Sequence, residues 1–130
     1  MPTIITYKDL ETWQVAMDFV ERIYRSTTSF PMSELYGLTT QLRRAAVSIP
    51  SNVAEGYCRK SLTKVYINHV SIALGSHGEI ETCIEISWRL GFLSDEEKNA
   101  LLALCDSVGR LLHGLHRSLE TKLLTQEAQR

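Results

Sequence analysis

Residues 41–56 read QLRRAAVSIPSNVAEG, and the rest of the chain is organised around this stretch. At about 100° per residue of an α-helix, one stripe along it is apolar and consists of Leu38, Leu42, Ala45, Ala46, Ile49 and Val53. A neighbouring stripe within an arc of roughly 80° is polar and consists of Gln41, Arg44, Ser48, Asn52 and Glu55. The apolar stripe predicts a helix packed on a core. The polar stripe predicts a helix edge that pairs with another element.

Composition indicates one soluble domain, residues 1–130, with 44% hydrophobic and 22% charged residues. The 14 Lys and Arg nearly balance the 15 Asp and Glu, so no overall field attracts nucleic acid or an anionic membrane. Cys58, Cys83 and Cys105 are an odd number without CxxC spacing, which favours reduced thiols over disulfides or a zinc site. Neither a signal peptide nor an apolar run of ~20 residues is evident. We therefore expect a cytoplasmic protein without a membrane partner.

Four helical patterns and almost no strand signal follow along the chain. Their expected bounds are about 9–27, 34–57, 62–90 and 95–120, and residues 121–130 are expected to fray. Short connections predict an all-α fold, an antiparallel up-down-up-down four-helix bundle. In the first helix, the face expected to be buried holds Leu10, Trp13, Met17, Val20 and Tyr24, with Ala16 and Ile23 at its margin.

Several residues predict where these helices begin and end. Ser33 and Ser61 are candidate N-caps of the second and third helices. Gly91 is expected to end the third helix, and the S-x-x-E run at residues 94–97 predicts a capping box that starts the fourth. Pro50 lies inside the second pattern and predicts a kink there.

The third helix carries two separate faces with apolar residues. One face holds Tyr66, Val70, Ala73, Leu74, His77, Ile80, Ile84 and Trp88, and the other holds Val65, Ile72, Ser76, Glu79, Cys83, Ile86 and Leu90. A single bundle core uses only one of them well, so we expect the second face to contact another copy of the chain. The alternative is a wide-faced helix in a deep core.

The run QLRRAAVSIPSNVAEG, followed by IALGSHGEIET and LGFLS, resembles a family of small proteins encoded within intervening sequences of bacterial large-subunit ribosomal RNA genes. The similarity spans residues 7 to about 119. It implies an antiparallel four-helix bundle assembled as a homopentamer, with no known enzymatic activity. A related branch, the accessory variability determinants of diversity-generating retroelements, is basic, binds nucleic acid and assists a reverse transcriptase. This chain differs from that branch in being near neutral.

No arrangement of residues predicts catalysis. A ferritin-like di-iron site needs Glu-x-x-His, which is absent from the sequence. His113-x-x-His116 has the spacing of half a metal site, but a surface role is the simpler interpretation. His77 on an apolar face is expected to be a hydrogen-bonded core histidine. Without a phosphate-binding glycine loop or a nucleophile arrangement, we expect no enzyme, no cofactor and no metal.

Polar residues on the second and third helices are expected to form a network between helices or between subunits. They are Gln41, Arg44, Ser48, Asn52, Glu55, Ser76 and Glu79. Within it, Arg44 is expected to pair with Glu79 or else with Glu55. The alternative is a solvated face, which small residues such as Ser and Asn make less favourable in an exposed helix.

Cations at two places could instead bind RNA or DNA. Arg59, Lys60 and Lys64 precede or begin the third helix, and Arg110 and Arg117 share a face of the fourth. The net charge argues against this role. The sequence therefore favours a non-enzymatic oligomeric scaffold whose partner is itself, most simply a pentamer. A nucleic-acid-binding accessory protein is the alternative, and no small-molecule substrate is indicated.

Overall fold

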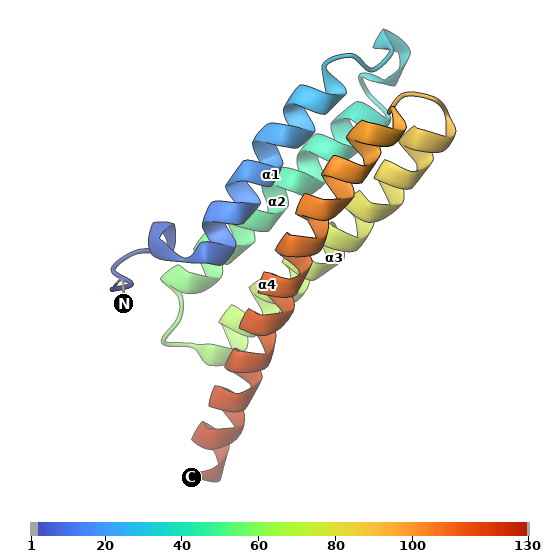
Figure 1. Cartoon of the computed structure of the whole chain (residues 1–130). Helices are drawn as coiled ribbons and strands as arrows, with labels where there is room; N and C mark the ends of the chain where they lie inside the picture. The colour runs from blue at the N-terminus through green and yellow to red at the C-terminus, as the bar shows by residue number, and fades with distance from the viewer. Residues whose placement is uncertain (1–2, 130) are drawn as a thin grey trace.

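A computed structural model describes residues 3–129, which form four α-helices and two short 3-10 helices. The α-helices are α1 (Glu11–Thr27), α2 (Leu38–Cys58), α3 (Thr63–Arg89) and α4 (Asp95–Ala128). The 3-10 helices η1 (Tyr7–Asp9) and η2 (Met32–Glu34) precede α1 and α2. Figure 1 shows the four α-helices side by side, with the end of α4 extending beyond the others. Residues 3–129 contain no strand, so the predicted all-α class with four helices is confirmed.

Each helix packs against two neighbours. α2 contacts α1 and α3, and α4 contacts the same two helices, whereas α1 and α3 do not touch and lie at opposite corners. Ser48 contacts Ser76 while Asn52 contacts His69, so α2 and α3 run in opposite directions along their contact. The outer sides of α1 and α3 therefore face away from one another on opposite sides of the bundle.

The core is mainly aliphatic, and the aromatic rings of Phe19 and Phe30 are also buried in it. All six residues of the apolar stripe predicted on α2 are buried, from Leu38 to Val53. On α1 the buried face is rotated slightly from the predicted one: the buried residues are Thr12, Ala16, Phe19, Ile23, Ser26 and Thr27, whereas Leu10, Trp13 and Val20 are partly buried against the core. Met17 and Tyr24, expected to be buried, are exposed, and the Tyr24 ring lies 4.7 Å from the Arg43 guanidinium carbon. An aromatic side chain can either pack in the core or stack on a cation at the surface. Helical periodicity alone does not show which of the two a given aromatic residue does.

The starts of α2 and α3 differ from the prediction. Ser33 lies in η2, and α2 begins four residues after Glu34, with Gly37 at the N-cap, where no side chain of the cap residue can accept a hydrogen bond. The Glu34 carboxylate instead accepts from the Leu38 amide at 3.3 Å. Ser61 is also not a cap, since Leu62 occupies that position. In both places a backbone turn before the helix displaces the serine from the capping position.

The turn between α3 and α4 follows the prediction more closely. Gly91 has φ 82°, and its amide donates to the Trp88 carbonyl at 3.0 Å while the Phe92 amide donates to the Ser87 carbonyl at 2.9 Å. These two bonds form a Schellman motif, which ends α3. Ser94 then accepts from the Glu97 amide at 3.1 Å. Only this half of the predicted capping box forms, because the Glu97 side chain turns toward α1.

Two further features of the helices follow from packing. α2 continues through Pro50, which is buried, so the proline does not end the helix. α4 continues to Ala128, whereas the sequence predicted fraying from residue 121. Leu119 is the last buried residue of α4 in the part of the chain described, in a small cluster with Tyr66 and Val70.

Glu97 joins α4 to α1 through Arg22. The Arg22 guanidinium donates to the two carboxylate oxygens at 2.8 and 2.7 Å, and Ser26 also donates to this carboxylate. The hydrogen bond from Arg22, followed by that from Ser26, lowers the pKa of Glu97 against an opposing effect of burial. A lowered folded-state pKa stabilises the fold above the ordinary value of about 4.3 and loses this effect as the pH falls through the folded-state value.

We expect Glu97→Gln to lower the free energy of unfolding by about 1 kcal/mol at pH 7, since the pair is partly exposed. The difference from wild type should shrink in acid, where Glu97 is protonated in both states. Urea unfolding at about pH 7 and about pH 2 measures this. Glu96→Gln is the matched control, because Glu96 also lies in the first turn of α4 but is exposed. An equal loss from Glu97→Gln at both pH values would contradict the electrostatic origin.

Candidate functional site

A row of hydrogen-bonded polar side chains lies between α2 and α3, and we call it the polar seam: Ser48, Asn52, Glu55, His69 and Ser76. The Ser76 hydroxyl donates to the Ser48 hydroxyl at 2.8 Å. The Asn52 amide nitrogen donates to Ser48 Oγ at 3.1 Å and to the Ser48 carbonyl at 2.9 Å. The seam thus joins the two helices through neutral groups over two turns.

His69 continues the polar seam toward the end of α2. Its Nδ1 lies 3.0 Å from Asn52 Oδ1 and 3.4 Å from Glu55 Oε2. Both oxygens are acceptors, so Nδ1 carries the hydrogen and donates. His69 was not predicted as part of the network. It lies seven residues before Ser76, which places both on one stripe of α3, and this spacing was the available signal.

Beside the polar seam, the first half of α2 and the middle of α3 form a groove. Its walls include Gln41 and Arg44 from α2, Ser76 and Glu79 from α3, and Tyr36 from the preceding loop. The predicted pairing of Arg44 within the subunit is wrong. In the part of the chain that the structure describes, Arg44 forms no ion pair, and the Glu55 carboxylate lies beside His69 Nδ1. Arg44 and Glu79 are both exposed, so water solvates them while Ser48 and Ser76 occupy the line of closest helix contact.

The second face of α3 is largely exposed. Ile72 is 46% exposed, Ile86 41% and Leu90 57%. Cys83, assigned to this face from the sequence, is instead buried in the core, where burial followed by the charge of Glu79 raises the pKa of its thiol. Large apolar side chains along one side of a helix are unfavourable in water. By helical spacing, the exposed row of Ile72, Ile86 and Leu90 shares one side of α3 with Ser76 and Glu79, which line the groove.

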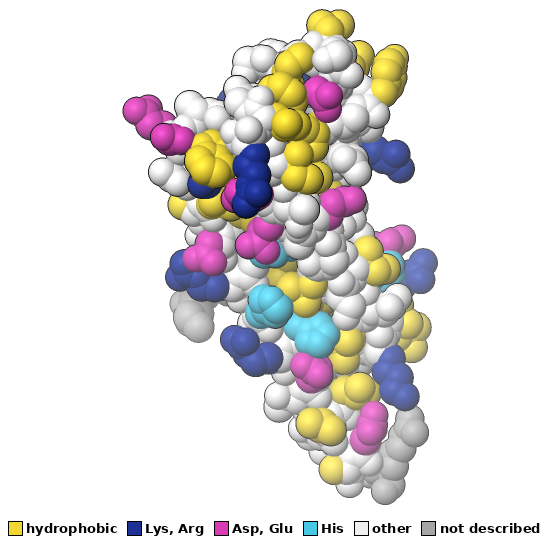
Figure 2. Space-filling model, turned by 90° about the vertical axis from the view of Figure 1, so that its right-hand side faces the viewer, with side chains coloured by type: hydrophobic (Ala, Val, Ile, Leu, Met, Phe, Trp, Pro, Cys, Tyr) yellow, Lys and Arg dark blue, Asp and Glu magenta, His cyan; other side chains and the backbone are white. Residues whose placement is uncertain are grey.

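The cations considered for nucleic acid do not form one patch. The Lys60 ammonium lies 2.9 Å from the Tyr57 hydroxyl and 4.0 Å from its ring centroid. Arg110 pairs with Asp106 one turn earlier on α4. Figure 2 shows one face on which Lys and Arg side chains are dispersed among carboxylates and uncharged surface. Arg59, Lys64 and Arg117 form no ion pair with any residue from 3 to 129.

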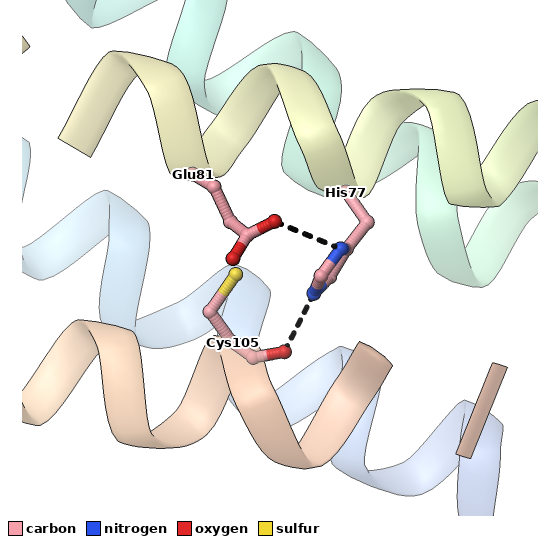
Figure 3. Close-up of side chains that lie close together, drawn as sticks. All are labelled: His77, Glu81 and Cys105. Carbon is pink, nitrogen blue, oxygen red and sulfur yellow. Dashed lines mark hydrogen bonds and ion pairs between the residues drawn. The ribbon is translucent and has the colours of Figure 1, made fainter. Parts of the chain in front are cut away.

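The histidines of α3 and α4 occupy different environments. His77 lies between the two helices, and its Nε2 is 2.8 Å from the Cys105 carbonyl oxygen, as Figure 3 shows. This agrees with the hydrogen-bonded histidine expected there. His116 contacts Glu120 Oε1 at 2.9 Å and Ser71 Oγ at 3.3 Å. His113 is exposed, and Glu120 is a carboxylate near His116 that the sequence argument overlooked.

None of the helices in residues 3–129 has an apolar stretch long enough to cross a membrane.

The sequence and the fold were compared with those of known proteins. No curated protein matches the chain. A crystal structure of a protein of unknown function from the S23 ribosomal protein family of Bacteroides thetaiotaomicron superimposes with a TM-score of 0.71 at 21% sequence identity. The match covers 81% of this chain and 97% of the other, and it shows a shared fold. Residues 8–114 match the family described as 23S rRNA-intervening sequence protein. The chain therefore belongs to the 23S rRNA-intervening sequence protein family.

Proposed function

We propose that this protein is a non-enzymatic scaffold whose subunits assemble into a cyclic homo-oligomer, with an up-down-up-down bundle as its building block. The observation that carries the proposal is the exposed row of Ile72, Ile86 and Leu90 on α3. These residues repeat at intervals of 14 and four along the helix, so they lie on one stripe. Covering them contributes roughly 25 cal/mol per Å² of apolar surface.

A second copy of the chain is the partner that best fits this surface. Arg44 and Glu79 lie beside the apolar row without an ion-pair partner among residues 3–129, so the face offers one charge of each sign to a neighbour. The net charge of −1 means that copies repel one another little. A face with both charges is complementary to a copy of itself or to a similarly mixed surface.

A ring of more than two subunits needs two different complementary faces on each subunit. Another side of the bundle supplies one: a groove between α1 and α2 lined mainly by apolar residues, among them Trp13, Met17, Val20, Val47 and Ala54. Because α1 and α3 lie at opposite corners, the α3 row of one copy can contact the α1–α2 groove of the next. Such head-to-tail contacts close into a ring, and the family resemblance implies five subunits.

Sedimentation equilibrium of the full chain at micromolar concentration tests this proposal. We expect a single species that contains more than two subunits of 14.7 kDa each. A monomer at these concentrations would refute the scaffold proposal.

Nucleic-acid binding is the second candidate, and the observation in its favour is that Arg59, Lys64 and Arg117 have no ion-pair partner among residues 3–129. If they bind phosphates, log affinity should fall with log salt at about −0.9 per duplex contact or −0.7 per single-strand contact. We expect Arg117→Ala to make the slope shallower by the value of about one phosphate contact per subunit. Arg110→Ala should change the slope less, because Asp106 already neutralises Arg110. Gel shifts with mixed RNA and DNA measure this. No shift at about 50 mM salt would exclude the candidate.

A further inference from the structure

Three side chains with metal-binding atoms meet between α3 and α4, on the side of α3 away from the polar seam. They are His77 and Glu81, four residues apart on α3, and Cys105 on α4, as Figure 3 shows. One ligand atom from each lies within 4.8 Å of the others. We propose that His77 Nδ1, a Glu81 carboxylate oxygen and Cys105 Sγ bind a zinc ion, with water as the fourth ligand.

The hydrogen bond of His77 leaves the correct nitrogen available. Its Nε2 is 2.8 Å from the Cys105 carbonyl oxygen, which can only accept, so Nε2 carries the hydrogen. In the neutral ring Nδ1 then has a free lone pair, and it lies 3.6 Å from Glu81 Oε1. Two acceptors that face each other need a proton or a cation between them. Zinc-bound histidines commonly donate their other ring hydrogen to a carbonyl or carboxylate, as His77 does here.

The position of the His77 ring is fixed by Gly109, one turn after Cys105 on α4. A Cβ atom at residue 109 would lie 2.7 Å from His77 Nε2, so only glycine lets the ring pack against this helix. The ring is therefore held by α4 from two sides, the Cys105 carbonyl and the Gly109 backbone. A ligand whose orientation is fixed before the metal arrives loses less entropy on binding.

The distances fit a tetrahedral site after a small adjustment. Donor atoms bound at about 2.0–2.3 Å to one zinc ion lie about 3.3–3.8 Å apart. The His77–Glu81 separation of 3.6 Å is within this range. The Glu81 side chain is 55% exposed and can move, whereas His77 is 12% exposed and Cys105 is buried. Glu81 therefore also marks the side on which the ion and its water enter.

The ligand set selects the class of metal. One thiolate, one imidazole and one carboxylate suit zinc, whereas magnesium and calcium prefer oxygen ligands alone. Burial, followed by the charges of Glu81 and Asp106, raises the pKa of Cys105 to about 12, so the thiol is protonated without a cation. On binding, the S–H bond breaks, a Zn–S bond forms and the proton passes to solvent.

Cobalt titration of the reduced, metal-free full chain tests the proposal. We expect a thiolate-to-cobalt charge-transfer band in the near ultraviolet and tetrahedral bands in the visible, both removed by zinc. Glu81→Gln, an exposed position that should not impair folding, is expected to weaken binding at least about 10-fold. Cys105→Ser should abolish the thiolate band. His113→Asn combined with His116→Asn should leave both sets of bands unchanged.

Cys58→Ser and Cys83→Ser are the matched controls, because Cys58 is exposed and Cys83 is buried away from His77. Both variants should retain the thiolate band. A band that persists in Cys105→Ser, or disappears in Cys58→Ser, would assign the metal to another thiol and overturn the proposal. Octahedral cobalt spectra, or an affinity unchanged in Glu81→Gln, would also overturn the proposal. The absence of any band at about 1 mM cobalt would overturn it too, and a proton on His77 would then be the only cation between the two acceptors.

Discussion

Ile72→Lys is expected to convert the assembly into folded monomers. The substitution places a charge in the α3 row, where the proposed neighbour would bury it without a partner. We expect the dissociation constant for assembly to rise at least about 100-fold, equivalent to about 2.7 kcal/mol. The subunit should keep its helical content, because Ile72 is 46% exposed and lies outside its core. Sedimentation velocity and circular dichroism measure the two effects separately.

The head-to-tail arrangement allows a stricter test. Val47→Lys alters the α1–α2 groove and should also give monomers, since Val47 is 40% exposed and lines the second of the two proposed contact faces. An equimolar mixture of Ile72→Lys and Val47→Lys retains one intact row and one intact groove, so it should form a 1:1 dimer and nothing larger. Met32→Lys, at a residue 82% exposed outside both faces, should leave the oligomer unchanged. A mixture that stays monomeric would contradict head-to-tail contact between these faces.

Gly56→Ala is expected to lower the free energy of unfolding by about 1–3 kcal/mol, although alanine favours a helix by up to about 1 kcal/mol over glycine. A Cβ at residue 56 would lie 2.6 Å from Tyr66 Cδ1 and 3.1 Å from His69 Cβ. The Tyr66 ring cannot easily retreat, because it is 5% exposed and packs edge-on against Tyr57. The close approach of α2 and α3 at the end of the polar seam therefore depends on this glycine.

Gly114→Ala is the control for this prediction, because a Cβ there would meet nothing within 4 Å. It should stabilise α4 by up to about 1 kcal/mol. Urea unfolding of both variants in the Ile72→Lys background keeps subunit assembly from contributing to the measured free energy. Equal stabilisation by both alanines would show that α2 and α3 can separate at residue 56 without cost.

Local sequence determined the class of the fold and several helix ends. The apolar stripe from Leu38 to Val53 is buried as its period predicts, because an α-helix fixes which residues share a face whatever packs against it. Gly91 ends α3, since glycine adopts φ 82° without a steric penalty. The exposed row of Ile72, Ile86 and Leu90 was likewise evident from spacing. These features depend on residues within about one to five helical turns of each other.

Tertiary structure decided which polar groups meet. The sequence predicted a charge pair for Arg44, yet the side-chain hydrogen bonds between α2 and α3 involve Ser48, Asn52, His69 and Ser76. Glu97 has the spacing of a capping box but binds Arg22, 75 residues away. His77, Glu81 and Cys105 meet only because α4 packs against α3 with Gly109 opposite the imidazole ring. Periodicity gives the direction of a side chain on its own helix. The packing of the whole core sets the rotation and separation of neighbouring helices, and these determine which side chains come within bonding distance.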